Sequence, residues 1–177
     1  IDFLQQNLRE PDETLGDIRA QFSAYDVATK KLLTLLNEEK LNDLDEIISN
    51  ILKKSEQSMR KKIKDIPDGK YVDEMFVDGF DNPLKIKCVI EVKKDNIVID
   101  FSGTSKQINR PINSVFNYTY AYACYALKCA IDPNAPNNDG SFRPVKIIAP
   151  KGTIVNPTRP APVWGRHLTG HYIPPAI

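Results

Sequence analysis

Prolines are concentrated at the C-terminal end of this 177-residue chain, where the last 45 residues contain nine of the thirteen. Because proline fixes φ and donates no main-chain hydrogen bond, most of this segment cannot form helix or regular sheet. Between residues 137 and 167, glycines, asparagines and arginines surround only two short apolar runs, residues 145–149 and 153–155, which we expect to be strands. The fold must therefore combine a rigid, irregular segment with regular elements formed elsewhere in the chain.

Two periodicities indicate those regular elements. Apolar residues recur at helical spacing from residue 14 to about residue 67, with a break near residues 37–42, which predicts two long helices forming an antiparallel hairpin. From residue 70 to residue 101 the period changes to two, which predicts three antiparallel strands with turns at residues 80–83 and 94–96. In this register Ile86 and Ile90 face the core, and Lys85 and Glu91 face solvent.

One further helix is predicted over residues 113–130. Tyr118, Tyr122, Tyr125 and Cys129 fall at steps of four, three and four, so they share one face, and we expect this face and the neighbouring alanines to pack on the sheet. The alternative is that the tyrosines stack on a ligand. The fold class is then α+β, with a helical hairpin over residues 1–68 and an α/β portion carrying the proline-rich segment over residues 69–177. We expect the two to form one domain of a longer polypeptide.

Charge and cysteine content exclude several classes of protein. A net charge of +1 gives no reason to expect nucleic acid or an anionic membrane as a partner, and no apolar run approaches the roughly 20 residues that span a bilayer. Cys88, Cys124 and Cys129 form no CxxC pair, so neither a disulfide framework nor a zinc ribbon is indicated. We expect Cys124 and Cys129 to be buried, and the protein to be soluble and cytoplasmic.

Two local patterns have a functional and a structural interpretation. His167 and His171 have the spacing of two ligands on a helix face, but Gly170 lies between them and no glutamate follows His167, which excludes a zinc-protease helix. A metal role for this pair is the weaker alternative, and we expect no metal site in this chain. The basic run at residues 60–64 could bind phosphate, but it closes a predicted helix, where cations stabilise the negative end of the dipole.

The strand ending near residue 100 leads into a small hydroxylated turn, where main-chain N–H groups and hydroxyls can receive a carbonyl or anionic oxygen. The alternative is a capped turn that bonds its own backbone. In the irregular segments, arginines could clamp a carboxylate or phosphate, or could instead brace the loop by bonding carbonyls. No catalytic residue can be assigned. The candidate substrate-binding residues are Ser102, Gly103, Thr104, Asn113, Arg143, Asn156 and Arg166.

Four segments, in order along essentially the whole chain, resemble the hydantoinase B / 5-oxoprolinase family. They are REPDETLGDIRAQFSA at residues 9–24, DFSGTS at 100–105, RPIN at 110–113 and NDGSFRPVKIIAPKGTIVNPTRPAPV at 138–163. The family includes the B subunits of ATP-dependent N-methylhydantoinases and 5-oxoprolinases, and a related subunit of acetone and acetophenone carboxylases.

This resemblance implies a hetero-oligomer in which the B subunit works with an A-type partner of the actin-like ATPase class. The partner would use ATP to activate the small-molecule substrate, and the B subunit would complete hydrolysis of a cyclic amide, such as a hydantoin or 5-oxoproline, or carboxylation of a ketone. The family's metal-associated segment contains an Asn-Asp-Pro-Tyr run that this chain lacks, so we expect the divalent metal outside it and no cofactor within it. We expect the fragment alone to be inactive; a structural or assembly role is the alternative.

Overall fold

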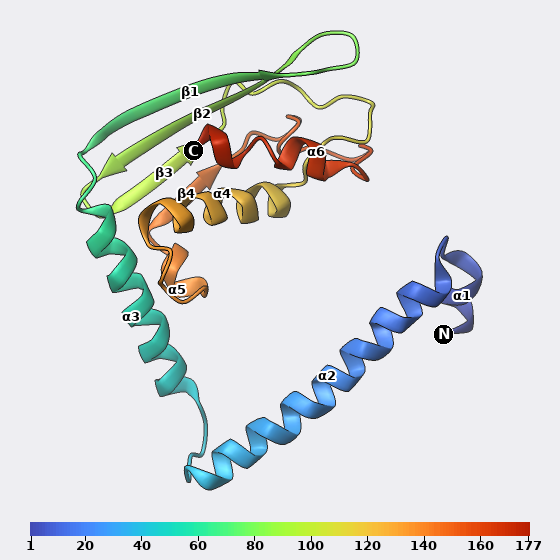
Figure 1. The fold of residues 1–177 in the computed structure, drawn as a ribbon, viewed down its shortest axis with the longest axis vertical. Coiled ribbons are helices and arrows are strands. Elements are labelled where there is room, and N and C mark those ends of the chain that lie inside the picture. Colours follow the sequence, from blue (N-terminus) through green and yellow to red (C-terminus); the bar gives the residue numbers. More distant parts are fainter. The chain divides into compact units, whose positions relative to one another are not determined.

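The computed structural model describes residues 1–177 and shows an α+β chain (Figure 1). It divides into two compact units, Ile1–Ile48 and Ser49–Ile177. None of its helices has both the length and the apolar character needed to cross a bilayer. The elements in order are α1 (Asp2–Asn7), α2 (Pro11–Glu38), α3 (Asp45–Ile63), β1 (Gly69–Val77), β2 (Leu84–Lys93), β3 (Asn96–Asp100), α4 (Phe116–Ile131), α5 (Asp139–Phe142), β4 (Val145–Ile148), α6 (Arg166–Gly170) and the 3-10 turn η1 (Pro174–Ala176).

The first unit is dominated by the 28-residue helix α2. Proline at its first position and two acidic residues in its first turn suit a helix N-terminus. Leu15 is its single buried residue. The two long helices are confirmed, and the break between them contains Lys40 with a positive φ of 53°. Because the boundary between the units falls inside α3, the packing of the helices as a hairpin stays a prediction, as does a domain boundary at residue 68.

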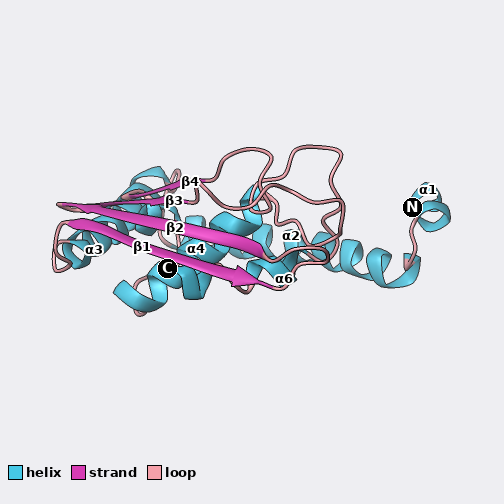
Figure 2. Cartoon of the chain, turned by 90° about the horizontal axis from the view of Figure 1, so that it is seen from above, coloured by secondary structure: helices cyan, strands magenta, loops and turns pink.

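The second unit is built on a four-stranded sheet in the order β1-β2-β3-β4 (Figure 2). The three predicted strands are confirmed, with antiparallel pairing of β1 to β2 and of β2 to β3. The fourth strand was expected only as a short run, and it pairs parallel to β3, so the sheet as a whole is mixed. Parallel neighbours need a long crossover connection, which α4 and α5 supply between β3 and β4.

The second short apolar run is not a strand, contrary to the sequence prediction. Residues 153–155 take part only in isolated bridges, from Thr153 to Lys106 and to Asn156. The main-chain N–H of Gly152 donates to the oxygen of Asn156 over 2.9 Å, which closes this stretch into a turn. The main chain of Ile154 bonds to neighbouring loops, accepting from the N–H of Ser114 over 2.6 Å and donating to the carbonyl oxygen of Ser105 over 3.0 Å.

The register of the antiparallel strands is as predicted. Ile86 is fully buried, and Ile90 is half-buried and packs against the core. On the opposite face, Lys85 lies 3.8 Å from a carboxylate oxygen of Glu74, and Glu91 lies 3.7 Å from the amino group of Lys70. One face of the sheet is therefore apolar and covered, and the other carries charge.

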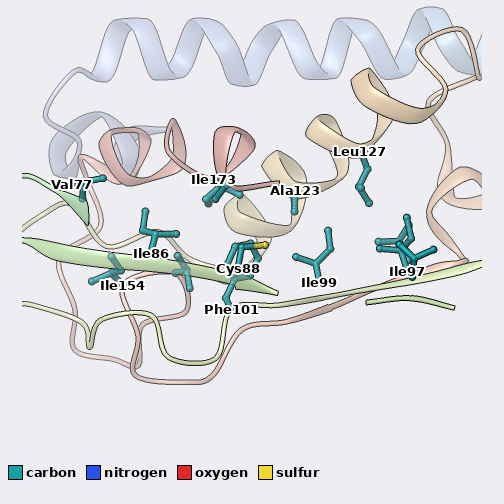
Figure 3. Packing of buried hydrophobic residues seen from close by; sticks show 14 of the residues in the cluster. Val77, Ile86, Cys88, Ile97, Ile99, Phe101, Ala123, Leu127, Ile154 and Ile173 are labelled. Carbon is teal, nitrogen blue, oxygen red and sulfur yellow. The ribbon is translucent and has the colours of Figure 1, made fainter. Parts of the chain in front are cut away.

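Helix α4 covers the apolar face, and Figure 3 shows Ala123 and Leu127 pointing toward Ile97, Ile99 and Cys88. Its buried residues are Thr119, Ala123, Cys124, Ala126 and Leu127.

The tyrosine face predicted for this contact is wrong for Tyr125, which is 61% exposed, and Cys129 is exposed rather than buried. The small residues of α4 recur at the same helical spacing as the tyrosines, and they allow the helix to approach the strands closely. Tyr118 and Tyr122 lie at the flank of the contact, half-buried.

The C-terminal half of α3 completes the core with Met59 and Ile63, both fully buried. Its last turn carries Arg60, Lys61 and Lys62, which confirms that the basic run ends a helix. Arg60 forms an ion pair of 2.8 Å with Glu56 one turn earlier. The three cysteines are free. Burial raises the pKa of the Cys88 thiol to about 12 and that of the Cys124 thiol to about 11, so both are neutral at physiological pH.

Candidate functional site

The turn after β3 is tied to strand β2 by its hydroxyl groups. The Thr104 hydroxyl accepts a hydrogen bond from the main-chain N–H of Lys87 and donates one to the carbonyl oxygen of Lys87, each over 3.1 Å. The main-chain N–H of Ser102 donates to a carboxylate oxygen of Asp100 over 2.8 Å, and Gly103 has a φ of 91°. Thr104 is thus used in extending the sheet, whereas Ser102 and Gly103 are exposed.

Asn113 is fully buried and holds the loop before α4 together. Its side-chain amide donates to the carbonyl oxygens of Ile108, Arg110 and Pro162, over 2.8, 2.9 and 2.9 Å. Its side-chain oxygen accepts from the N–H of Ile108 over 3.0 Å. The whole hydrogen-bonding capacity of this side chain is directed to main-chain groups, so in this structure Asn113 braces the loop.

Asn156 and Arg143 also bond within the protein. The Asn156 side-chain amide donates to the carbonyl oxygen of Ala149 over 2.6 Å. Arg143 lies 3.0 Å from a carboxylate oxygen of Asp139 and 3.5 Å from one of Glu56. Hydrogen bonds from Arg60 and then from Arg143 hold the pKa of Glu56 below its usual range. The Arg143 guanidinium therefore links α3, through Glu56, to the first residue of α5, Asp139.

Arg166 lies in a different environment, which we call the aromatic–histidine cluster: Tyr118, Tyr122, Arg166, His167 and His171. The guanidinium carbon of Arg166 lies 5.5 Å from the Tyr118 ring centre. The rings of Tyr118 and Tyr122 stack at 4.8 Å, and their hydroxyls are 3.1 Å apart. The ring centres of Tyr122 and His171 are 6.1 Å apart, and so are those of His171 and His167. The hydrogen bond between the tyrosines raises the pKa of Tyr118.

Three contacts fix helix α6, which carries Arg166 and His167 of the cluster and is directly followed by His171. The main-chain N–H of Gly165 donates to the carbonyl oxygen of Pro111 over 2.6 Å, and the buried Thr169 hydroxyl donates to that of Ile112 over 2.5 Å. Gly170 lies against the Tyr118 ring so closely that a Cβ atom would overlap it. Loop, helix α4 and helix α6 are therefore held as one framework, from which the cluster projects.

Two hollows lie beside this framework and share the exposed ring of Phe80. One, of about 390 Å³, is lined by Asp78, Phe80, Leu168, His171 and Tyr172, among others. The other, of about 450 Å³, is lined in part by Phe80, Asn109 and Arg110. The Arg110 guanidinium carbon lies 4.8 Å from the Phe80 ring centre. The hollows bring together the turn before β2, the loop at residues 108–112 and α6.

This arrangement can bind a small polar ligand. A guanidinium, two imidazoles and two phenol groups offer hydrogen-bond donors to an oxygen atom, and the adjacent aromatic faces can contact a ring. A metal ion fits the residues poorly, because no group of three or more histidine, cysteine, aspartate or glutamate side chains converges anywhere in the structure. The absence of a metal from this part of the chain stays a prediction.

Of the seven sequence-predicted residues, Arg166 belongs to the cluster, and Asn113 braces the loop beneath it through Pro162. No hydrogen bond or aromatic contact joins the other five to the cluster.

Sequence reasoning missed Phe80, Arg110 and the involvement of His171 in a hollow. The signal that could have indicated them is an aromatic residue in the polar turn Phe80-Asp81-Asn82-Pro83, where burial in a core is excluded. Trp164, 81% exposed, is a second such signal beside α6.

An α+β unit with small hollows lined by aromatic, arginine and histidine side chains is typical of proteins that bind or transform small molecules. The chain belongs to the hydantoinase B/oxoprolinase family, whose model matches residues 1–177.

Two relatives are similar to the chain over nearly its whole length. The chain is 37% identical to an uncharacterised protein of Methanocaldococcus jannaschii, over 92% of its own length and 29% of that protein. It is 33% identical to the B subunit of a putative D-/L-hydantoinase of a Pseudomonas species, over 97% of its own length and 31% of that protein.

The fold matches that of an ATP-dependent caprolactamase from Pseudomonas jessenii with a TM-score of 0.79 and 24% identity, over 90% of this chain and 28% of the other. The chain thus spans about three-tenths of the length of these two relatives.

Proposed function

We propose that this chain is part of the B-type subunit of an enzyme that hydrolyses a cyclic amide, such as a hydantoin or 5-oxoproline, with the help of an A-type ATPase subunit. The observation that carries the proposal is the 33% identity, over 97% of the chain, to a protein named as the B subunit of a hydantoinase. The substrate is a small molecule, ATP is bound by the partner, and the enzyme is cytoplasmic, where the three free thiols would remain reduced.

Within such an enzyme, we assign substrate contact to the aromatic–histidine cluster. Arg166 is exposed, and its guanidinium makes one hydrogen bond, a long contact of 3.5 Å to the carbonyl oxygen of Val163. Its remaining donors are available to the oxygen of an amide or of a carboxylate that forms when the ring opens. The framework around Gly165, Thr169 and Gly170 orients the donors, and the hollow beside His171 gives room for the rest of the ligand.

The proposal is tested by assaying the complete subunit together with its ATPase partner. We expect ATP-dependent ring opening of a hydantoin or of 5-oxoproline, and no activity from the 177-residue chain alone. Acetone with bicarbonate is the matched substrate for the ketone-carboxylase alternative. Carboxylation without any amide hydrolysis would contradict the proposal, and activity that is fully retained after removal of residues 1–177 would favour a purely structural role for this part.

Substitution of Arg166 tests the site separately from the reaction. We expect Arg166→Ala to lower turnover roughly 10- to 100-fold, because it removes a charge-assisted hydrogen bond to the substrate. The melting temperature should be unchanged. Arg166→Lys keeps the charge but loses the planar fork, so little activity should return. The control is Arg159→Ala, at an equally exposed arginine of the same segment. Normal turnover in Arg166→Ala, or subunits that dissociate, would remove substrate contact from this cluster.

A further inference from the structure

Strand β1 forms one edge of the sheet, and the direction of its main-chain groups can be worked out from β2. The main-chain groups of Lys85 and Lys87 bond to residues 104 and 105, on the side of β2 away from β1. Residues alternate along a strand, so Ile86 and Cys88 bond toward β1, where their partners are Met75 and Asp73.

The intervening residues of β1 therefore direct their N–H and C=O groups to the free edge. These residues are Lys70, Val72, Glu74 and Phe76. The strand is nine residues long and contains no proline, so nothing in its backbone prevents a further strand from pairing there. Such an edge is an open template for another chain unless something covers it.

The side chains on this edge favour one partner in particular. Val72 lies midway between Lys70 and Glu74, and all three are on the charged outer face of the sheet. We propose that β1 pairs antiparallel with β1 of a second copy of this chain, about a two-fold axis that passes at Val72. Val72 then faces Val72 of the second copy, and Lys70 faces Glu74 of the second copy on both sides of the axis.

Neighbouring two-fold registers are worse on the same grounds. A shift of the axis to Asp73 places two aspartates directly opposite each other, and a shift to Glu74 does the same with two glutamates. Like charges opposite each other destabilise a strand pair, whereas opposite charges contribute roughly 0.2 to 1 kcal/mol. A shift to Tyr71 places Asp68 opposite Glu74, and a shift to Met75 leaves Glu74 opposite Phe76 and forms no opposite-charge pair. Charge complementarity thus favours a second copy as the occupant, paired at Val72.

The assembly would be limited to two copies, and the contact between them would be weak. A two-fold pairing uses the β1 edge of both copies at once, and the other edge of the sheet is the four-residue strand β4, so the assembly would stop at a dimer. A single pair of strands buries less than a standard protein interface, so we expect dissociation at micromolar concentrations or above. This inference concerns assembly and does not depend on the proposed reaction.

Cysteine cross-linking tests the register directly, in a Cys129→Ser background that removes the one exposed native thiol. We expect Val72→Cys to form a disulfide-linked dimer on mild oxidation, because residues directly opposite have a Cα separation compatible with a disulfide. A mixture of Lys70→Cys and Glu74→Cys proteins should form the mixed dimer. The control is Phe76→Cys, equally exposed on the same edge but facing no cysteine.

Sedimentation of the unmodified chain, at concentrations up to about 100 µM, should show a monomer–dimer equilibrium that Val72→Lys abolishes. A monomer throughout, or a Val72→Cys protein that cross-links no better than Phe76→Cys, overturns the proposal. Loss of the cross-link when the chain is part of the complete subunit would also overturn it, since another strand of that polypeptide would then cover β1.

Discussion

The irregular segment before α4 and the long helix α2 are supported in opposite ways. The irregular segment is fixed by side chains such as Asn113, and no buried side-chain nitrogen or oxygen in the structure lacks a hydrogen-bond partner. Helix α2 has a single buried residue, Leu15, while Phe22 and Leu33 are 63% and 55% exposed. Regular structure is therefore a poor guide to how firmly a segment is held in this protein.

The difference follows from where each segment finds its hydrogen bonds. A helix bonds its own main chain and needs tertiary contacts only for stability. A loop that enters the interior has no such internal partners, so each buried carbonyl must receive a donor from elsewhere. Single substitutions should thus be far more damaging in the irregular segment than in α2.

Asn113→Ala should produce the largest effect. The change removes donors from three carbonyl oxygens and an acceptor from one N–H, all in the interior, so we expect a loss of at least about 3 kcal/mol. For a protein of this size the melting temperature should fall by roughly 10 °C. Thermal unfolding followed by circular dichroism measures this. Asn117→Ala, on the exposed side of α4, is the control, and equal melting of the two variants would refute the bracing role.

Gly170→Ala should have an intermediate effect, because the new methyl group overlaps the Tyr118 ring. We expect destabilisation of about 1 to 3 kcal/mol, as in other overpacked sites. The near-ultraviolet circular dichroism of the stacked tyrosines should change with it. In a Tyr118→Ala background the same substitution should cost little, and a penalty that persists there would mean that the contact with Tyr118 is not its cause.

Gly16→Ala should have the opposite sign, because this glycine lies inside α2 and, apart from its chain neighbours and the backbone of its own helix, no atom lies within 4 Å of the position of a Cβ. Alanine favours the helical state over glycine by roughly 0.8 to 1 kcal/mol. Slower amide hydrogen exchange along α2 measures the gain without requiring a global change in melting. Faster exchange would show that the helix is restrained at this point by a contact.

Glu56→Gln should have the smallest effect, and one that depends on pH. The pKa of Glu56 is lowered in the folded state, so its contribution to stability is present above the ordinary glutamate pKa of about 4.3 and is lost as pH falls through the lower folded value. Wild type and variant should therefore differ slightly near pH 7 and converge in acid. Urea unfolding of both proteins near pH 7, and again at a pH below the folded pKa of Glu56, measures this difference. A difference that grows in acid would contradict the ion pairs with Arg60 and Arg143.

The sequence predicted the elements whose cause is local. Alternation along residues 84–92 gave the correct register, because one face of these strands is buried and the other is charged. The strand at residues 145–148 was predicted, but its parallel pairing with β3 could not be, since that pairing depends on a crossover of more than forty residues.

The candidate site was predicted least well. The buried face of α4 was misassigned because its small residues and its tyrosines follow the same spacing. The cluster and the hollow beside it were hidden because they come from segments that meet only in the fold: Tyr118 in α4, Phe80 in the turn before β2 and His171 after α6.

The exposed Trp164 has a practical consequence, because it is the only tryptophan of the chain and directly precedes the glycine that anchors α6. Excitation at wavelengths that tyrosine absorbs weakly makes the emission come from this single point of the surface. A molecule that covers α6 should shift that emission to shorter wavelengths, whereas strand pairing at β1 should leave it unchanged. The unmodified protein thus carries a fluorophore that can distinguish occupancy of the aromatic–histidine cluster from self-association.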